Sequence, residues 1–265
     1  MDNTEALLIA FDAQARPEPP DPPAGIRYEQ DGPVLRVVGA DRGFISAPPD
    51  TGLRGAELDQ LIARQRDYFT ERGEAVEWKT YAHDQPPDLV ARLRAAGFVA
   101  EDLETVLVGR TEQMATPPVL PGGVVLRQVT ADADMRRIAD MESAVWGDDR
   151  GRTGDHLIRW AAAAPEDFLV LVAEAGTQVV AAGWISFLES SDFAGLWGGA
   201  TLREWRRKGI YHALVAARAQ LAAARGVPYL QVDASSDSAP ILRRLGFQAI
   251  TTTTPYVWTP PAPLP

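Results

Sequence analysis

The chain has 265 residues, of which 46% are hydrophobic and 23% charged, values that are ordinary for a globular protein of one large domain or two small ones. Acidic residues outnumber basic ones by 36 to 26, which argues against a protein whose main task is to bind nucleic-acid phosphates through clustered Lys and Arg. Because cysteine is absent and only three histidines are present, disulfides, thiolate zinc sites and cysteine nucleophiles are excluded, and no metal is expected.

The amino terminus does not resemble a signal peptide, because Met1 to Glu5 is acidic where a secretory signal would be basic. The longest apolar runs, residues 168–173 and 179–188, are far shorter than the roughly 20 residues needed to span a bilayer. We therefore expect a cytoplasmic protein without membrane or nucleic-acid partners.

Proline marks the expected joints of the chain. Residues 16–23 contain five prolines and predict an extended loop, since proline fixes φ and lacks a backbone donor. A second Pro/Gly-rich stretch, residues 116–123, predicts an interdomain linker. We therefore expect a first domain at 1–115, a second at 124–258, and a flexible Pro-rich tail at 259–265.

In the first half, helix and strand patterns alternate after residue 55. The predicted elements are a helix at 56–72 stopped by Gly73, a strand at 76–81, a helix at 88–95 and a strand at 103–109.

The second half predicts a mixed α/β domain. Its strands are expected at 124–128, 168–174, 179–187, 195–202, 229–233, 247–250 and 256–258, and its helices at 132–145, 155–164, 209–225 and 239–245. The two strands at 168–187 form an antiparallel hairpin. In the helix at 209–225, apolar residues at spacings of four, three and four share one face, and Gly226 ends the helix.

The end of each half shows the same order of elements. Residues 93–98, Leu-Arg-Ala-Ala-Gly-Phe, resemble residues 242–247, Leu-Arg-Arg-Leu-Gly-Phe, and each follows a helix, a glycine and a strand. We interpret this as an internal duplication; the alternative is a unit that α/β proteins often contain.

A basic cluster precedes the helix at 209–225. Arg203, Arg206, Arg207 and Lys208 lie next to Gly209, at a helix start whose free N–H groups and dipole favour an anion such as a diphosphate. The alternative is a solvated basic surface.

The pattern Arg206-x-x-Gly209-x-Tyr211 resembles the Gln/Arg-x-x-Gly-x-Gly/Ala loop of the GNAT acetyltransferases, with Tyr211 in place of the usual small residue. The order of elements over residues 124–258 agrees with that family. The resemblance implies two GNAT-like mixed-sheet domains in tandem, in which only the second binds acetyl-CoA, between diverging strands at 195–202 and 229–233. At the corresponding place in the first half, residues 45–52 contain two prolines and no basic cluster, so no CoA is expected there.

The family pattern implies a set of cofactor-binding residues that act mostly through their main chain. Gly199 and Thr201 would bind pantetheine and polarise the thioester carbonyl, and Arg206 would add charge. The N–H groups expected to bind the diphosphate belong to Arg207, Lys208, Gly209, Ile210 and Tyr211.

The acid and base of the family are not matched. Leu242 stands where many members carry a tyrosine acid, Trp197 where many carry a glutamate, and Ser235 where an asparagine is usual. Asp233 or Ser235 could fill these roles, as could Glu189, Asp192 or water; Asp233 is the first candidate, and its alternative is a cap of the turn that follows.

The resemblance implies an N-acetyltransferase that moves an acyl group from acetyl-CoA to a primary amine of a small molecule or peptide by direct attack. Two other readings stay open. One is a non-catalytic CoA-binding protein, motivated by Leu242; the other is a structural protein that has lost cofactor binding, motivated by Tyr211. The acidic surplus is compatible with a cationic acceptor.

Overall fold

The computed structural model describes residues 3–18, 22, 25–40 and 42–261, and no helix among them is long and apolar enough to cross a bilayer. By its contacts the chain divides into two compact units. The first unit comprises Met1–Leu107, Asp233–Ile241 and Ala249–Pro265, and the second comprises Val108–Val232 and Leu242–Gln248. The predicted loop at 16–23 and the predicted tail at 259–265 lie partly outside the described residues.

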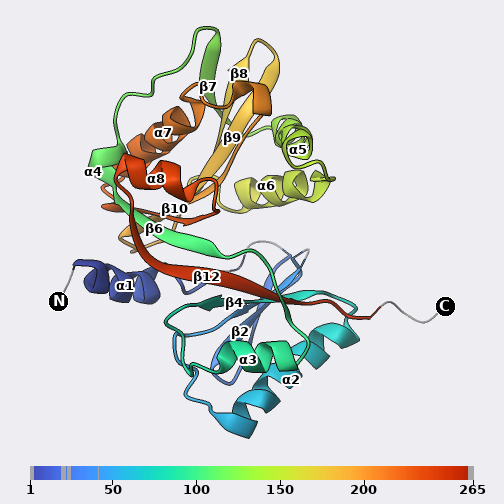
Figure 1. The fold of residues 1–265 in the computed structure, drawn as a ribbon. Coiled ribbons are helices and arrows are strands. Elements are labelled where there is room, and N and C mark those ends of the chain that lie inside the picture. Colours follow the sequence, from blue (N-terminus) through green and yellow to red (C-terminus); the bar gives the residue numbers. More distant parts are fainter. Residues whose placement is uncertain (1–2, 19–21, 23–24, 41, 262–265) are drawn as a thin grey trace. The chain divides into compact units, whose positions relative to one another are not determined.

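The first unit is a mixed sheet with helices (Figure 1). Its strands follow the order β1-β2-β3-β4-β12, with β5 also paired to β12; β3 and β4 are parallel and the other pairs antiparallel. The elements are α1 (Asn3–Gln14), β1 (Arg27–Asp31), β2 (Val34–Val38), β3 (Gly43–Ser46), α2 (Gly55–Glu71), β4 (Val76–Tyr81), α3 (Leu89–Ala95), β5 (Val99–Ala100) and β12 (Gln248–Trp258). Strand β6 (Glu104–Arg110) runs across the division between the units.

The second unit carries strands β7-β8-β9-β10-β11, antiparallel except for the last pair. Its elements are α4 (Thr111–Met114), β7 (Val124–Val129), α5 (Asp132–Trp146), α6 (Gly151–Ala163), β8 (Phe168–Ala175), β9 (Gln178–Phe187), β10 (Phe193–Thr201), the 3₁₀ turn η1 (Arg203–Trp205), α7 (Ile210–Ala224), and parts of β11 (Tyr229–Ala234) and α8 (Ala239–Leu245). The end of β11 and the start of α8 belong to the first unit, which includes Asp233–Ile241. The mixed α/β class expected from the sequence is confirmed.

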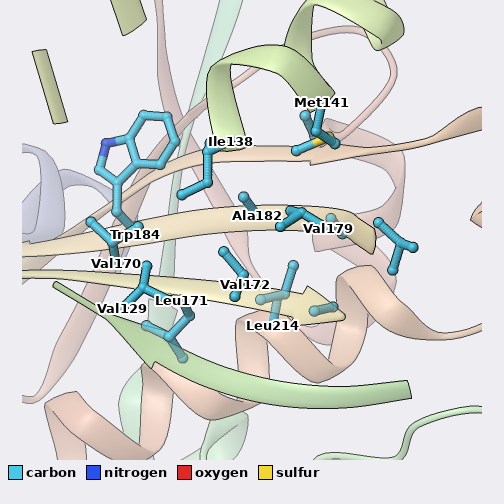
Figure 2. Packing of buried hydrophobic residues seen from close by; sticks show 14 of the residues in the cluster. Val129, Ile138, Met141, Val170, Leu171, Val172, Val179, Ala182, Trp184 and Leu214 are labelled. Carbon is cyan, nitrogen blue, oxygen red and sulfur yellow. The ribbon is translucent and has the colours of Figure 1, made fainter. Parts of the chain in front are cut away.

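The core of the second unit lies on both faces of β8 and β9. Ile138 and Met141 of α5 approach these strands from one side and Leu214 of α7 from the other (Figure 2). All residues of β8 except the last are buried. A strand covered on both faces needs apolar side chains throughout, which explains the continuous apolar run in the sequence.

The two halves end their short helices in the same way. Gly97 and Gly246 have φ of +94° and +103°, a left-handed conformation that suits glycine at a helix end. In both segments, 93–98 and 242–247, the phenylalanine N–H donates a 3.0 Å hydrogen bond to the carbonyl of the leucine five residues earlier. The repeated sequence therefore encodes a repeated helix cap.

The end of the chain differs from its prediction. We expected two short closing strands at 247–250 and 256–258, but residues 248–258 form one strand, β12, that pairs with β4 from Trp258 opposite Val76 to Thr253 opposite Tyr81. The intervening threonines are β-branched and suit a strand. The last strand is thus part of the sheet of the first unit. A smaller difference concerns α6, which begins at Gly151 rather than near 155; the Gly151 N–H donates a 2.8 Å hydrogen bond to the Asp149 carboxylate.

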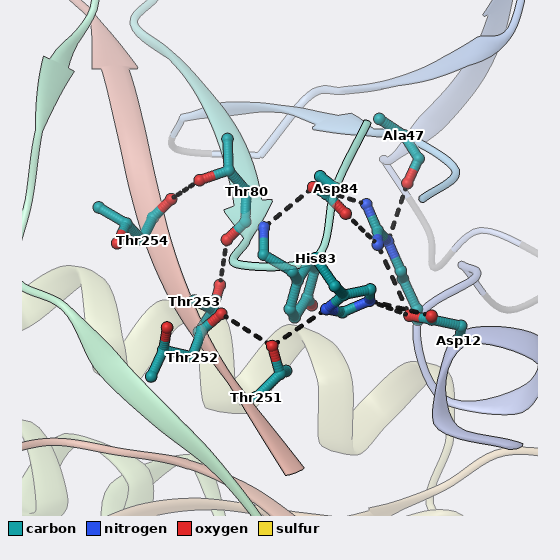
Figure 3. Close-up of polar contacts among 11 residues, drawn as sticks. Asp12, Ala47, Thr80, His83, Asp84, Thr251, Thr252, Thr253 and Thr254 are labelled. Carbon is teal, nitrogen blue, oxygen red and sulfur yellow. Dashed lines mark hydrogen bonds and ion pairs between the residues drawn. The ribbon is translucent and has the colours of Figure 1, made fainter. Parts of the chain in front are cut away.

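A polar network attaches the threonines of β12 to the rest of the first unit (Figure 3). The Thr253 hydroxyl donates to the Thr80 carbonyl at 2.8 Å. The two ring nitrogens of His83 lie 3.0 Å from the Thr251 hydroxyl and 3.0 Å from an oxygen of Asp12 in α1. Neither α1 nor strands β1 to β3 were predicted, because α1 and β2 contain nearly continuous apolar runs that do not distinguish helix from strand, and the other two strands are short.

The position of β12 predicts the effect of a core substitution near the end of the chain. Tyr256 is 3% exposed within the core of the first unit. Tyr256→Ala should lower the free energy of unfolding by about 3 kcal/mol, the usual cost of removing a buried aromatic ring, as measured by urea unfolding. Val99→Ala, at a position that is 69% exposed, is the control and should change stability by less than about 0.5 kcal/mol. Equal unfolding curves for the two variants would contradict the placement of Tyr256 in this core.

Candidate functional site

Strands β10 and β11 diverge after a short parallel pairing. Their ladder joins Phe193 to Tyr229 and ends at Gly195 opposite Gln231. Beyond that point β10 continues along β9 only. The expected divergence of these strands is confirmed, and it leaves backbone groups on their facing edges without a ladder partner.

Strand β10 contains a bulge just beyond this point. Its register with β9 shifts between Gly198 and Ala200, so Gly199 has no partner in the ladder. The φ angles of Gly198 and Gly199 are +68° and +99°. A Cβ at Gly198 would lie 2.4 Å from the Trp184 ring, and one at Gly199 would lie 2.9 Å from the Tyr211 ring. Both the backbone angles and the close packing therefore require glycine here.

The loop before α7 presents unpaired N–H groups. Arg207 and Gly209 have φ of +61° and +83°, and the helix begins at Ile210. Within the described part of the chain, none of the backbone N–H groups from Arg207 to His212 donates a hydrogen bond; the first that does is that of Ala213, to the Gly209 carbonyl at 3.0 Å. A Cβ at Gly209 would meet only the Val119 carbonyl, at 3.7 Å. Such a helix start binds anions through its N–H groups and its dipole.

The basic side chains of this loop lie at the same place. Arg203, Arg206, Arg207 and Lys208 are exposed and form no ion pair with any carboxylate of the described residues. Arg206 donates from Nε to the Thr201 carbonyl at 3.1 Å, and the Lys208 ammonium lies 4.6 Å from the centre of the Trp205 ring. The positive charge of the loop is therefore not neutralised locally.

Thr201, at the end of β10, carries a buried hydroxyl without a hydrogen-bond partner among the described residues. A buried hydroxyl without a partner is costly, so the Thr201 hydroxyl has a hydrogen bond still to form. The structure therefore brings together, in the second unit, all the residues that the resemblance assigned to the cofactor: Gly199, Thr201, Arg206, Arg207, Lys208, Gly209, Ile210 and Tyr211.

The helix start in the first unit that corresponds to this loop is different. The Asp50 carboxylate accepts a 2.8 Å bond from the Gly52 N–H and pairs with Arg54, directly before α2. An acidic side chain thus lies where the other unit offers free N–H groups. That the first half binds no CoA stays a prediction.

Asp233, the first candidate for a base, is 6% exposed and accepts a 2.5 Å hydrogen bond from Lys79 of β4. Burial is the largest single influence on the pKa of Lys79 and lowers it, but Asp233, Tyr81 and Glu104 together outweigh burial, so the pKa lies above its usual value. The Tyr81 hydroxyl interacts with both Lys79 and Asp233, and burial raises its pKa, so Tyr81 is neutral at neutral pH. Lys79 is 154 residues from Asp233 in sequence, and no local pattern indicated the pair. The structure thus gives Asp233 an ion-pair role in the first unit; its role as a base stays a prediction.

The other candidates for acid and base lie as follows. Ser235 is exposed, and its carbonyl accepts the Ala239 N–H at 2.9 Å, which starts α8. Glu189 and Asp192 are exposed, and Leu242 is fully buried in the apolar core. Among the residues that the structure describes, no three His, Asp or Glu side chains gather in a way that could hold a metal ion.

The sequence did not lead us to expect a role for Arg218 near the site. This arginine is 2% exposed in the middle of α7 and donates to carbonyls of β9 and β10. Its position in the helix could have indicated burial, because Arg218 follows the apolar Leu214 by four residues and so lies on the same, buried side of α7.

Comparisons with known proteins agree with this geometry. Residues 135–247 match the model of the Acetyltransferase (GNAT) family. No curated protein matches the sequence significantly. Among solved structures, a GCN5-related N-acetyltransferase from Kribbella flavida is 17% identical with a TM-score of 0.66, covering 96% of this chain and 93% of that one.

Two further structures resemble the whole chain. A tandem GNAT protein from the clavulanic acid biosynthesis pathway, determined without AcCoA, is 15% identical with a TM-score of 0.64, covering 98% of this chain and 95% of that one. A GCN5-related N-acetyltransferase from Sphaerobacter thermophilus is 17% identical with a TM-score of 0.60, covering 98% and 94%. At these identities the likeness shows the fold. The chain therefore has the fold of tandem GNAT proteins, and its residues 135–247 match the GNAT acetyltransferase family.

Proposed function

We propose that this protein is an N-acyltransferase that moves an acetyl group from acetyl-CoA to a primary amine by direct attack. The observation that carries the proposal is the run of unpaired N–H groups from Arg207 to His212, beside a basic loop and diverging strands. This arrangement suits the diphosphate of a CoA ester better than an isolated anion, because the free strand edges lie next to it along the chain.

The residues present fit acetyl-CoA. The N–H groups before and within the first turn of α7 can bind the diphosphate, and Arg207 and Lys208 add positive charge. The buried hydroxyl of Thr201 lacks a partner and can bond the pantetheine arm. Tyr211, which stands where the family usually has a small residue, packs against Gly199. The N–H groups of the loop still have no backbone hydrogen-bond partner among the described residues.

Acetyl-CoA supplies an acyl group activated as a thioester, and the chain supplies the groups that bind and polarise it. The N–H of Gly199, which lacks a ladder partner in β9, is the candidate donor to the carbonyl oxygen as negative charge develops there. The acceptor amine must lose a proton to a base or to water. Asp233, Ser235, Glu189 and Asp192 remain the candidates for this step.

The acceptor is proposed to be a cationic amine on a small molecule or peptide, in keeping with the net charge of −10. A specific observation favours a second function. Leu242, where many family members carry a proton donor, is fully buried. The second candidate is therefore a protein that binds CoA esters without catalysis.

The two functions differ in turnover. We expect free CoA to be released from acetyl-CoA in the presence of some members of a panel of primary amines, with the acylated amine detected by mass spectrometry. Tight binding of acetyl-CoA, measured by calorimetry, without amine-dependent release of CoA would favour the non-catalytic function.

The unpaired hydroxyl of Thr201 predicts an unusual substitution. Thr201→Val removes no hydrogen bond from the free protein, so its melting temperature should not fall, whereas the Kd for acetyl-CoA should rise about fivefold through the loss of one hydrogen bond. The matched control is Thr111→Val, which removes another buried and unpartnered hydroxyl of the same unit and should leave the Kd unchanged. Equal effects of the two variants on the Kd would refute a role for Thr201 in binding.

The basic loop predicts an electrostatic effect on binding. Replacing Arg207 and Lys208 together by Glu should raise the Kd for acetyl-CoA roughly tenfold to a hundredfold, since hydrogen bonds to charged groups are lost and repulsion is added. Replacing Arg243 and Arg244, both exposed on α8, by Glu makes the same change in net charge and should alter the Kd less than about twofold. If the loop variant binds as tightly as the wild type, the diphosphate is not bound here.

A further inference from the structure

The second unit contains a buried cation without an anionic partner. Arg218 is 2% exposed and forms no ion pair with any carboxylate of the described residues. Burial lowers the pKa of Arg218 to about 10, and Tyr211 offsets this only in part, so the side chain is still protonated at neutral pH. Burying an unpaired charge is costly, and a structure that keeps one needs a compensating interaction.

The guanidinium bonds only to main-chain oxygens. Its Nε donates to the Leu214 carbonyl within α7 at 3.0 Å. Its Nη1 donates to the carbonyls of Trp184 in β9 and Trp197 in β10, at 3.1 and 3.0 Å. Trp184 and Trp197 are opposite each other in the ladder, so a single nitrogen links the two strands at this pair.

This link lies directly beside the bulge of β10. Trp197 immediately precedes Gly198, and the partner of Gly198 in the ladder is Gly183. A Cβ at Gly183 would lie 3.0 Å from the guanidinium carbon, so glycine is what admits the side chain. The remaining nitrogen, Nη2, donates no hydrogen bond to any residue that the structure describes. The buried charge thus lies against the bulge with one donor unused.

We propose that Arg218 is a positioning residue for acyl transfer, which holds the β10 bulge through the Trp197 carbonyl and favours negative charge on the CoA sulfur beside that bulge. The inference rests on the proposed function and deepens it. With Leu242 in place of a proton donor, the leaving sulfur must carry its charge for longer, and a fixed cation in a dry environment stabilises such a charge strongly.

The step itself balances without a further reactant. The lone pair of the amine nitrogen attacks the thioester carbon, the C–N bond forms and the C–S bond breaks, with its electron pair leaving on sulfur. The proton that the nitrogen loses reaches the sulfur through water, so the products are an amide and the CoA thiol. Arg218 keeps its proton throughout, and its effect is on the stability of the anionic sulfur.

The test measures the pKa of the thiol of bound CoA, from the ultraviolet absorbance of the thiolate during a pH titration. This readout needs no turnover and would not respond to a purely structural role. In the wild type the pKa of the bound thiol should lie below that of free CoA. In Arg218→Met it should rise by about one pH unit relative to the wild type, a tenfold change in the fraction of thiolate.

Arg218→Lys separates charge from geometry and remains informative if the Met variant fails to fold. Lysine keeps the cation but cannot reproduce the three bonds of the guanidinium, so the pKa of the bound thiol should stay within about 0.3 of the wild type. The kcat for the best amine should fall about tenfold in both variants, with the KM for acetyl-CoA changed less than threefold. Arg225→Met, which removes an exposed arginine at the end of the same helix, is the control and should behave as the wild type.

The outcomes distinguish this inference from the proposed function. Amine-dependent release of CoA by the wild type, together with equal thiol pKa values in the wild type and the Met variant, would overturn the role of Arg218 and leave the proposed function standing. A thiol pKa that depends on Arg218 without any turnover would support the inference and favour the non-catalytic function. Failure of the wild type to bind CoA would overturn both.

Discussion

The second unit depends on one constraint, which is that buried backbone groups need partners where a sheet opens. Once β10 leaves β11 beyond Gly195, and once the bulge at Gly198 and Gly199 breaks the register with β9, several main-chain groups lose their ladder bonds. Arg218 of α7 donates hydrogen bonds to two carbonyls at this point, those of Trp184 and Trp197. The N–H groups of Gly199 and of the loop before α7 have no such partner in the ladder or the helix. These are the donors that we propose bind a CoA ester.

The same constraint explains the unusual residues near the site. Positions 198 and 199 require glycine, because both have positive φ angles and because the rings of Trp184 and Tyr211 leave no room for a Cβ. Position 183 requires glycine because the Arg218 guanidinium packs directly against it. A mutually dependent set of this kind is energetically coupled, so substitutions within it are not expected to add.

The first unit uses its polar residues for stability. Asp233 is paired with Lys79, and the threonines of β12 are tied to β4 and to His83. Asp50 occupies the loop before α2 where the second unit leaves free N–H groups. The same helix cap occurs at Gly97 and Gly246, one in each half of the chain. The loops before the two long helices differ, because Asp50 pairs with Arg54 before α2, whereas the basic side chains before α7 have no carboxylate partner among the described residues.

Local patterns determined much of this protein. The periodicity of α2, β4, α7 and α8, the hairpin of β8 and β9, and the glycine caps could all be predicted, because each depends on residues close together in the chain. The pattern formed by Arg206, Gly209 and Tyr211 resembles the GNAT family and pointed to the loop before α7 as the diphosphate site. Tertiary structure alone decided that β12 completes the first sheet, that Lys79 pairs with Asp233, and that the charge of Arg218 is buried beside the bulge. These features depend on contacts between residues far apart in sequence, and neither periodicity nor spacing encodes which distant partner a buried charge or a strand edge will find.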